Sequence, residues 1–237
     1  MQRKILGLFL FYTLITAGCG AQNATPTSSP DPVNNDSVDK SPFTGIPCAA
    51  PCWHGLEVGK SHEKDVLSTI PRLNFIDRKS VYFRVLPSMN TVDNPRVFGK
   101  GIVIYSNCIN SEVRCLTIQV VEDILTEISI VLNYQINIGE AIDYLGNPNY
   151  VGFSEASGGP ATCRVYLIWS EKSLVLESNI VDDLNGTEKN CPEVGDAGKI
   201  SHDLLISEVR YMSAATIEEL HSSSANEFFE FSGTLSD

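Results

Sequence analysis

The chain has 237 residues and carries 29 acidic against 17 basic side chains, so its formal net charge is −12 at pH 7. Nucleic-acid phosphates and anionic lipid headgroups both attract basic surfaces, which an acidic chain of this kind does not supply. We therefore exclude nucleic acid as a partner and charge as a means of membrane attachment. Solubility through self-repulsion explains the acidity, with an acidic binding patch as the alternative.

The N-terminus has the pattern of an export signal. Arg3 and Lys4 precede an apolar stretch, residues 5–17, that is too short to cross a membrane and suits a signal-peptide core. The sequence Ala17-Gly18-Cys19 resembles the bacterial lipobox, which implies a lipoprotein signal peptide over 1–18 and lipid on Cys19. The alternative is an ordinary signal peptide cleaved nearby. Both predict export. The lipobox implies the bacterial cell envelope, on the outer side of the cytoplasmic membrane or in an outer membrane.

Residues 19–47 are expected to form a disordered tether. They are rich in Pro, Ser, Thr, Asn and Asp, and such a segment buries too little apolar surface to offset the entropy lost on ordering. Its acidic side chains, Asp31, Asp36 and Asp39, are expected to be solvated.

Six cysteines follow Cys19, and an even number in an exported chain predicts three disulfides. Sequence alone does not choose the connectivity, but proximity favours Cys48–Cys52, Cys108–Cys115 and Cys163–Cys191. Three residues separate Cys48 from Cys52, where a thioredoxin-like redox motif has two, and no second Cys or His pair has zinc-finger spacing. We expect structural disulfides and no metal site.

The first half of the body, 48–134, begins with a short helix. Ser61 is positioned to cap this helix, and Pro71 ends it. Four segments then have the period-two alternation typical of antiparallel strands packed on one face: 81–86, 101–106, 116–121 and 128–132.

In the second half, 135–237, apolar residues recur at helical spacing from Ile138 to Leu145, and Gly146 and Pro148 follow. We expect Ile142 and Leu145 to be buried and Gly146 to be left-handed. Thr216 is expected to cap a final short helix. Strands are predicted at 165–169, 174–177 and 205–211, the last with Leu205, Ser207, Val209 and Tyr211 on one side.

The fold class predicted is α+β, with two tandem repeats that each contain a short helix followed by an antiparallel meander of about four strands. The repeats are 48–134 and 135–237, the second with a C-terminal helix and tail. Gly59 and Gly139 would then occupy equivalent places at the entry of equivalent helices.

A helix introduced by hydrophobic-x-hydrophobic-Gly and closed by Leu145-Gly146-Asn147-Pro148, before a meander, is similar to the small outer-membrane assembly lipoproteins. In tandem the pattern resembles the β-lactamase inhibitor protein fold. The opening Pro51-Cys52-Trp53-His54-Gly55-Leu56 resembles uncharacterised bacterial lipoproteins with two such repeats. The first half departs from the pattern at Thr69-Ile70-Pro71. These short motifs imply a fold and no particular activity.

The motifs of common catalytic sites are incomplete. Residues 55–61 have three residues between their glycines, where a phosphate loop has four. The four histidines have no zinc-binding spacing, and no Gly-x-Ser-x-Gly elbow occurs. Adjacent acids on strand ends or loops diverge, and 182–188 lack the alternation of a calcium loop. We predict no catalytic residue, cofactor or metal from the histidines and acid pairs, namely His54, His62, His202, His221, Glu122-Asp123 and Asp182-Asp183.

We therefore predict a lipid-anchored, non-enzymatic binding or scaffold module whose protein partner the sequence does not identify. One alternative is an inhibitor of a secreted hydrolase, from the fold resemblance alone, and another is an enzyme with a dispersed site. Aromatic residues form either core or a binding surface: Trp53, Tyr105, Tyr134, Tyr144, Tyr150, Tyr166, Trp169 and Tyr211.

Replacing Cys19 with Ser is expected to release the protein from membranes, because no basic surface is present as a second anchor. Fractionation of cells that express each form measures the effect. A wild-type product that is soluble, unacylated and begins at another residue would refute the lipid anchor.

Overall fold

The computed structural model describes residues 38–86, 89–91, 94–98, 100–156, 162–181, 200–222 and 226–231. They belong to a compact unit that begins at Asp36. The predicted signal peptide, Cys19 and most of the predicted tether lie outside the described residues, as do Cys191 and 182–190. None of the helices in the described ranges combines the length and the apolar character of a membrane span.

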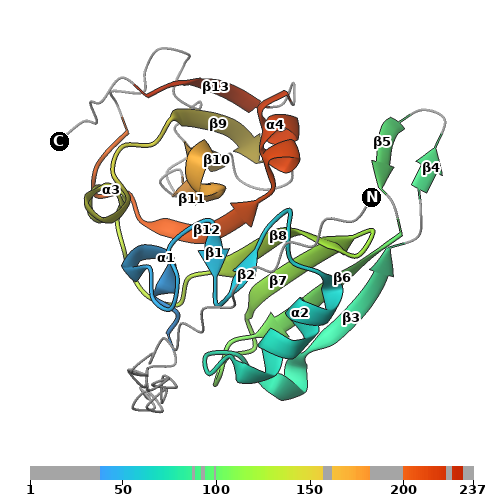
Figure 1. Ribbon diagram of the computed structural model, residues 1–237. Coiled ribbons are helices and arrows are strands. Elements are labelled where there is room, and N and C mark those ends of the chain that lie inside the picture. The colour runs from blue at the N-terminus through green and yellow to red at the C-terminus, as the bar shows by residue number, and fades with distance from the viewer. Residues whose placement is uncertain are drawn as a thin grey trace, which may run out of the picture. The chain divides into compact units, whose positions relative to one another are not determined.

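The fold is α+β, as predicted, and its main element is a nine-stranded antiparallel sheet (Figure 1). The strand order is β13-β9-β10-β11-β12-β8-β7-β6-β3. Along the chain these strands are β3 (Tyr82–Leu86), β6 (Gly101–Asn107), β7 (Arg114–Val121), β8 (Ile124–Val131), β9 (Tyr150–Ala156), β10 (Thr162–Trp169), β11 (Leu174–Val181), β12 (Ile206–Met212) and β13 (Asn226–Glu230).

Short elements flank the sheet. The helices are α1 (Ser41–Thr44), α2 (Glu63–Thr69), α3 (Ile138–Leu145) and α4 (Ala214–Ser222), with 3₁₀ turns η1 (Ile70–Arg72), η2 (Arg78–Ser80) and η3 (Ser170–Lys172). Two separate hairpins pair β1 (Cys52–Trp53) with β2 (Leu56–Glu57), and β4 (Met89–Thr91) with β5 (Asn94–Phe98).

The connectivity places a helix before each run of four meander strands. Helix α2 precedes β3, β6, β7 and β8, and α3 precedes β9, β10, β11 and β12. The two runs join through their fourth strands, where Val209 of β12 lies opposite Ile130 of β8. The alternation of apolar residues therefore predicted all four strands of the first run and three of the second.

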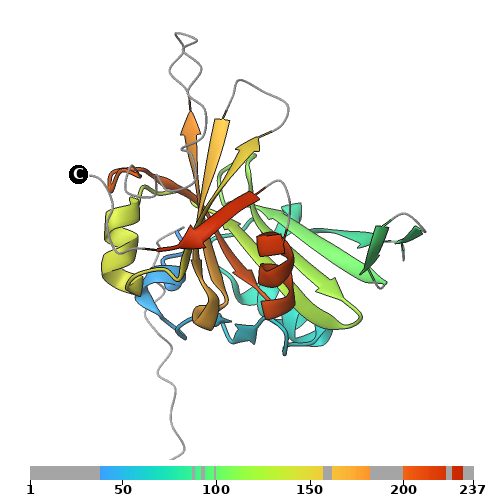
Figure 2. The ribbon, with the colours of Figure 1, turned by 90° about the horizontal axis from the view of Figure 1, so that it is seen from above.

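The two faces of the sheet are covered differently. Helices α3 and α4 lie on opposite sides of strands β9 to β12 (Figures 1 and 2). The main core lies on the α3 side and includes Trp53, Ile118, Ile128 and Val209, which are almost fully inaccessible to solvent. A smaller cluster beneath Ile217 of α4 includes Tyr166, Ile168, Val175 and Met212.

Strand β9 was not predicted, because Gly152 interrupts its alternation. A Cβ atom at Gly152 would lie 2.1 Å from the ring of Phe228 on β13. A side chain there would displace the Phe228 ring. The glycine is therefore required by the close approach of the neighbouring strand.

Two predicted helix caps were wrong. Helix α2 follows His62, whose backbone N–H donates to Asp65 at 3.0 Å, while the Ser61 hydroxyl accepts from the Glu57 N–H. Helix α4 follows Ser213, which accepts from the Thr216 N–H, so Thr216 is inside the first turn.

Helix α3 has the predicted bounds. The Asn137 side chain accepts from the Glu140 N–H at 2.8 Å and forms a capping box. Gly139 is inside α3, whereas Gly59 lies in the turn before α2 with φ of +79°, so the two glycines are not equivalent. Gly146 has the expected positive φ, +76°, but a ψ of −178°, which is not the left-handed helical value.

Burial along α3 differs from the prediction. Ile138 and Ala141 are fully buried, whereas Ile142 and Leu145 are partly buried against the core. Leu205 is exposed and precedes β12, and Ser207 is half-buried. The pairing of β11 with β12 shifts register at Glu177/Ser178, so Ile206 takes the buried place expected for Leu205.

Replacing Ile138 with Ala is expected to lower the free energy of unfolding by about 2–5 kcal/mol, because the deletion leaves a cavity in a closed core. Leu145→Ala is the comparison, and its cost is expected to be smaller because solvent already reaches Leu145. Urea denaturation of both variants measures the difference. Equal losses would contradict this description of the helix face.

Candidate functional site

A buried carboxylate anchors the beginning of the folded unit. Asp39 is only 7% exposed. Its Oδ2 accepts a hydrogen bond from the Trp53 indole N–H at 2.8 Å, and its Oδ1 accepts from the Ser41 N–H at 3.0 Å. The expectation that Asp39 is solvated was wrong, and residues 38–47 of the predicted tether are part of the fold.

The hydrogen bonds keep Asp39 ionised. Burial raises the pKa of the Asp39 carboxyl, but hydrogen bonds from His54, Ser41 and Trp53, together with the charge of His54, outweigh burial and leave the pKa below its ordinary value. A carboxylate that accepts several hydrogen bonds behaves in this way.

Asp39, His54 and Ser41 have the residue types of a catalytic triad but not its geometry. The Ser41 hydroxyl oxygen lies 3.5 Å from His54 Nε2, and Asp39 Oδ1 lies 3.4 Å from the same nitrogen. A triad histidine contacts serine through one ring nitrogen and the acid through the other. In this arrangement Asp39 cannot orient the imidazole for proton transfer from Ser41, so the cluster is structural.

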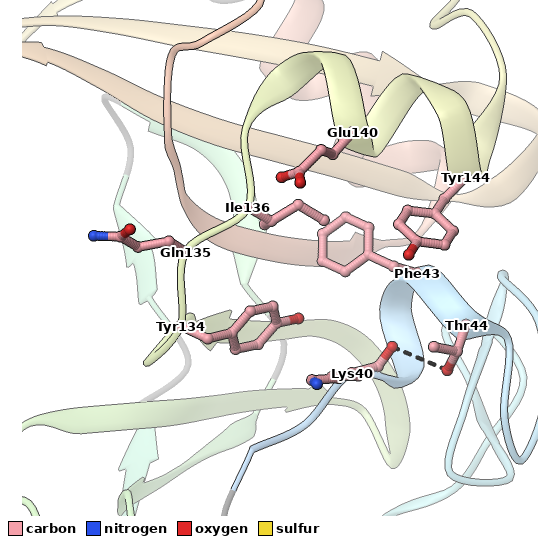
Figure 3. Close-up of a pocket in the computed structure, with 8 residues that line it drawn as sticks. All are labelled: Lys40, Phe43, Thr44, Tyr134, Gln135, Ile136, Glu140 and Tyr144. Atoms are coloured by element: carbon pink, nitrogen blue, oxygen red, sulfur yellow. Dashed lines mark hydrogen bonds between the residues drawn. The ribbon is translucent and has the colours of Figure 1, made fainter.

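A pocket of about 170 Å³ lies beside this cluster, between α1 and the start of α3. Figure 3 shows Phe43 and Tyr144 on one side of it and Tyr134 on the other, with Gln135 pointing away. The Tyr134 hydroxyl donates to the Asp39 carbonyl at 3.0 Å, and burial raises its pKa, so it remains protonated. Drug-sized ligands occupy about 300–1,000 Å³, and this pocket is too small for one.

The more extensive polar site lies on the face of the sheet that carries α4. We call it the charged face cluster: Glu127 on β8, Arg164 on β10, Glu177 on β11, and Glu208 and Arg210 on β12. These side chains alternate with the buried apolar residues of the same strands. Their positions across four neighbouring strands bring three carboxylates and two guanidinium groups together.

Arg210 is at the centre of the cluster. Its Nε and Nη2 donate to Glu127 Oε1 at 2.9 and 2.6 Å. Its Nη1 lies 3.9 Å from Glu177 Oε2, and its Nε lies 3.6 Å from Glu208 Oε1. Although burial opposes its charge, the three carboxylates, led by Glu127, raise the pKa of Arg210.

Glu177 and Arg164 are at the two extremes of exposure in the cluster. The Glu177 side chain is 8% exposed and lies 3.5 Å from the Nε of Arg164, whose side chain is 47% exposed. Burial, followed by the charge of Glu208, raises the pKa of Glu177, while Arg164 and Arg210 oppose the rise. The least exposed acid of the cluster, Glu177, is therefore within ion-pair distance of its most exposed base, Arg164.

The adjacent acids Glu122 and Asp123 do not belong to the charged face cluster. Glu122 and Asp123 lie in the β7–β8 turn, where Asp123 Oδ2 is 2.9 Å from His62 Nδ1. Asp182 and Asp183 lie outside the described residues. The acids that converge are instead Glu127, Glu177 and Glu208. Because they are far apart in sequence, the sequence did not indicate that they lie together.

The predicted disulfides are present where the structure describes both cysteines. Cys48–Cys52 and Cys108–Cys115 are bonded, with Cα atoms 5.6 and 5.3 Å apart. Cys163 is disulfide-bonded, and its predicted partner Cys191 lies outside the described residues. No group of three or more His, Cys, Asp or Glu side chains in the described part of the chain is arranged to hold a metal ion.

Four of the eight aromatic residues considered as a binding surface are buried. Trp53, Tyr166, Trp169 and Tyr211 lie in the two apolar clusters. Tyr105 stacks on Tyr82 at the β3 edge, with ring centroids 4.8 Å apart.

We compared the chain with family models, curated proteins and solved structures, and none of them matches it.

Stability is expected to fall at acid pH through Asp39. Because the folded-state pKa is lowered, its contribution is complete above the ordinary value of 3.8 and is lost as pH falls through the folded value. Asp39→Asn should therefore be less stable than wild type at neutral pH, and the difference should shrink in acid. Urea denaturation across this range tests it, with Asp143→Asn on the exposed side of α3 as control. A difference that does not change with pH would contradict the ionised state.

Proposed function

We propose that the chain is a lipid-anchored, extracytoplasmic, non-enzymatic binding or scaffold module that binds a protein partner through the charged face cluster. The observation that carries this proposal is a network of five charged side chains, partly desolvated, on a sheet face of which the described helices cover only the α4 end. The export signal and Cys19 support the location.

The energetics of the cluster favour a role in binding. Removing charges from water costs several kcal/mol per ion, so partly buried ion pairs contribute little net stability. An apolar set of residues would stabilise this sheet face at least as well. Charged groups held in fixed positions on an accessible surface do, however, select a partner with complementary charges.

We also propose that the two halves of the body are tandem repeats. The order of helix and four meander strands supports this proposal, as does the joining of the halves through β8 and β12. The difference between Gly59 and Gly139 and the β4–β5 hairpin in the first half are departures from exact repetition.

An enzyme with a dispersed site is the second candidate, because Glu177 is a buried carboxyl with a raised pKa near the second carboxyl Glu208. A general acid has these properties. However, Arg164 and Arg210 are also within ion-pair distance of Glu177 and favour its charged form. Binding therefore remains the first proposal, and inhibition of a secreted hydrolase is one form that it can take.

Arg164→Gln is expected to weaken partner binding by about tenfold, because the most accessible charge of the cluster is lost while the buried pairs around Arg210 remain. Proteins cross-linked to the wild-type chain in an extracytoplasmic extract are identified first, and the affinity of the purified partner is then measured. Lys100→Gln removes an exposed positive charge elsewhere and should bind as wild type does.

Equal binding by Arg164→Gln and wild type would refute the cluster as the binding site. A partner that is a hydrolase, and whose activity falls on binding, would identify the inhibitor form. Turnover of a small substrate that Glu177→Gln abolishes, with folding retained, would refute the non-enzymatic proposal.

A further inference from the structure

Within the described residues, the two ends of the nine-stranded sheet are open edges that differ in polarity and charge. Among the described residues, β3 pairs with β6 alone and β13 pairs with β9 alone. An open edge presents unpaired backbone N–H and C=O groups that can bond to another strand. Natural proteins usually block such edges with charges, proline, bulges or a covering segment.

The β3 edge is apolar and weakly protected. Phe83 is 54% exposed and Val85 is 61% exposed. Phe83 and Val81 line a mainly apolar hollow of about 210 Å³ that Leu67 and Pro71 close from the α2 side. Arg84 is the one charged residue within β3.

The sequence segments that contain the two edge strands differ in charge. Residues 72–100, which contain β3, have six basic and two acidic side chains. Residues 211–237, which contain β13, have five acidic side chains and no Lys or Arg. Glu230 at the end of β13 is exposed, whereas Phe229 and Phe231 are partly buried.

We propose that the β3 edge binds the β13 edge of a second copy of this chain, so that the sheet continues from one molecule to the next. Opposite charge on the two edges argues for this occupant. The contact joins two different surfaces, so each molecule keeps one open edge of each kind and the assembly extends beyond a dimer.

The strand directions allow a specific register. Every neighbouring pair in the sheet is antiparallel, so β3 and β13, the ninth and first strands, run in the same direction. A second copy added with the same face outward therefore pairs in parallel. With Arg84 beside Glu230, Tyr82 lies beside Phe228, and Phe83 lies beside Phe229.

The faces also agree in this register. Arg84 lies opposite Val103 on the face of the charged cluster, and Glu230 lies opposite Tyr150 on that same face. Phe83 and Phe229 lie on the α3 face, where Phe229 packs against the main core. One ion pair and two aromatic pairs would then cross the junction, and side-chain pairs of both kinds between neighbouring strands stabilise sheets.

Sedimentation of the full chain at increasing concentration tests this proposal. Wild type is expected to form species larger than a dimer. Arg84→Glu and Glu230→Arg should each weaken association by about tenfold, because each places like charges across the junction. The matched charge reversals Lys60→Glu and Asp143→Arg, at exposed positions outside the segments that contain β3 and β13, should associate as wild type does.

Restored association is the decisive result. The double variant Arg84→Glu/Glu230→Arg reverses the ion pair and should associate again. An equimolar mixture of the two single variants should do so as well, since each supplies the edge that the other lacks. This recovery also shows that neither variant has lost its fold.

A chain that stays monomeric at every concentration would overturn the proposal, as would a dimer that is unaffected by Glu230→Arg, which would indicate pairing between two β3 edges. Association that Arg84→Glu weakens but that neither the double variant nor the mixture restores would also overturn it. Because these outcomes concern Arg84 and Glu230, they are separate from binding at Arg164.

Discussion

The buried carboxylate of Asp39 holds the beginning of the fold in place. Asp39 joins its own segment to two others that are distant in sequence. Its carboxylate accepts from the Trp53 indole of the β1–β2 hairpin, and its backbone carbonyl accepts from the Tyr134 hydroxyl in the connection from β8 to α3. A lone carboxylate would not remain charged at this depth, since desolvation would favour the protonated form. The hydrogen bonds from Trp53 and the Ser41 backbone make the charge tolerable, so the apolar side chains around them can close over it.

This anchor also explains why one sheet face is closed. With residue 39 fixed, α1 packs beside α3, and Phe43 and Trp53 join the main core. The opposite face has no comparable cover from the described elements except α4, which reaches Tyr166, Val175 and Met212. Charged residues of β8 and β12 therefore remain partly exposed, and the charged face cluster occupies the middle of the sheet, where the two meanders meet.

Local patterns in the sequence predicted the elements but not their long-range contacts. Alternation identified β6, β7 and β8 because each packs on a core with one face, and the apolar spacing of α3 gave its exact bounds. Glu127 and Arg210 are 83 residues apart, and only the pairing of β8 with β12 brings them together. On their own strands both occupy ordinary polar positions, so no local signal separated them from solvated charges.

Asp39 was misplaced for a related reason. Its neighbours include Pro, Ser, Asn and Lys. The prediction of a disordered tether was based on the average composition of the segment, which gives no weight to the contacts of a single residue. Trp53 nevertheless carried a signal, because a buried indole N–H needs a hydrogen-bond acceptor. Asp39, in the polar segment that precedes Trp53 in the sequence, could supply that acceptor. The α2 cap failed similarly, since the Ser61 hydroxyl was already engaged by the Glu57 backbone in a turn that helix rules do not consider.

The paired fourth strands determine what remains at the ends of the sheet. Joining two four-stranded meanders through β8 and β12 leaves the first strand of each, β3 and β9, at the outside. The chain continues past the second meander and adds β13 to β9, which raises the number of strands to an odd value, so the two edges run in the same direction. Without β13 the edges would be antiparallel, and each would be the first strand of a meander. The extra strand therefore makes the two edges different, and the glutamates in its sequence make the β13 edge the acidic one.

Because the whole chain is acidic, two copies repel each other at long range, and salt screens that repulsion beyond about 8–10 Å. Contacts between Arg84 and an acidic strand act within that distance, so local complementarity can prevail over the net charge.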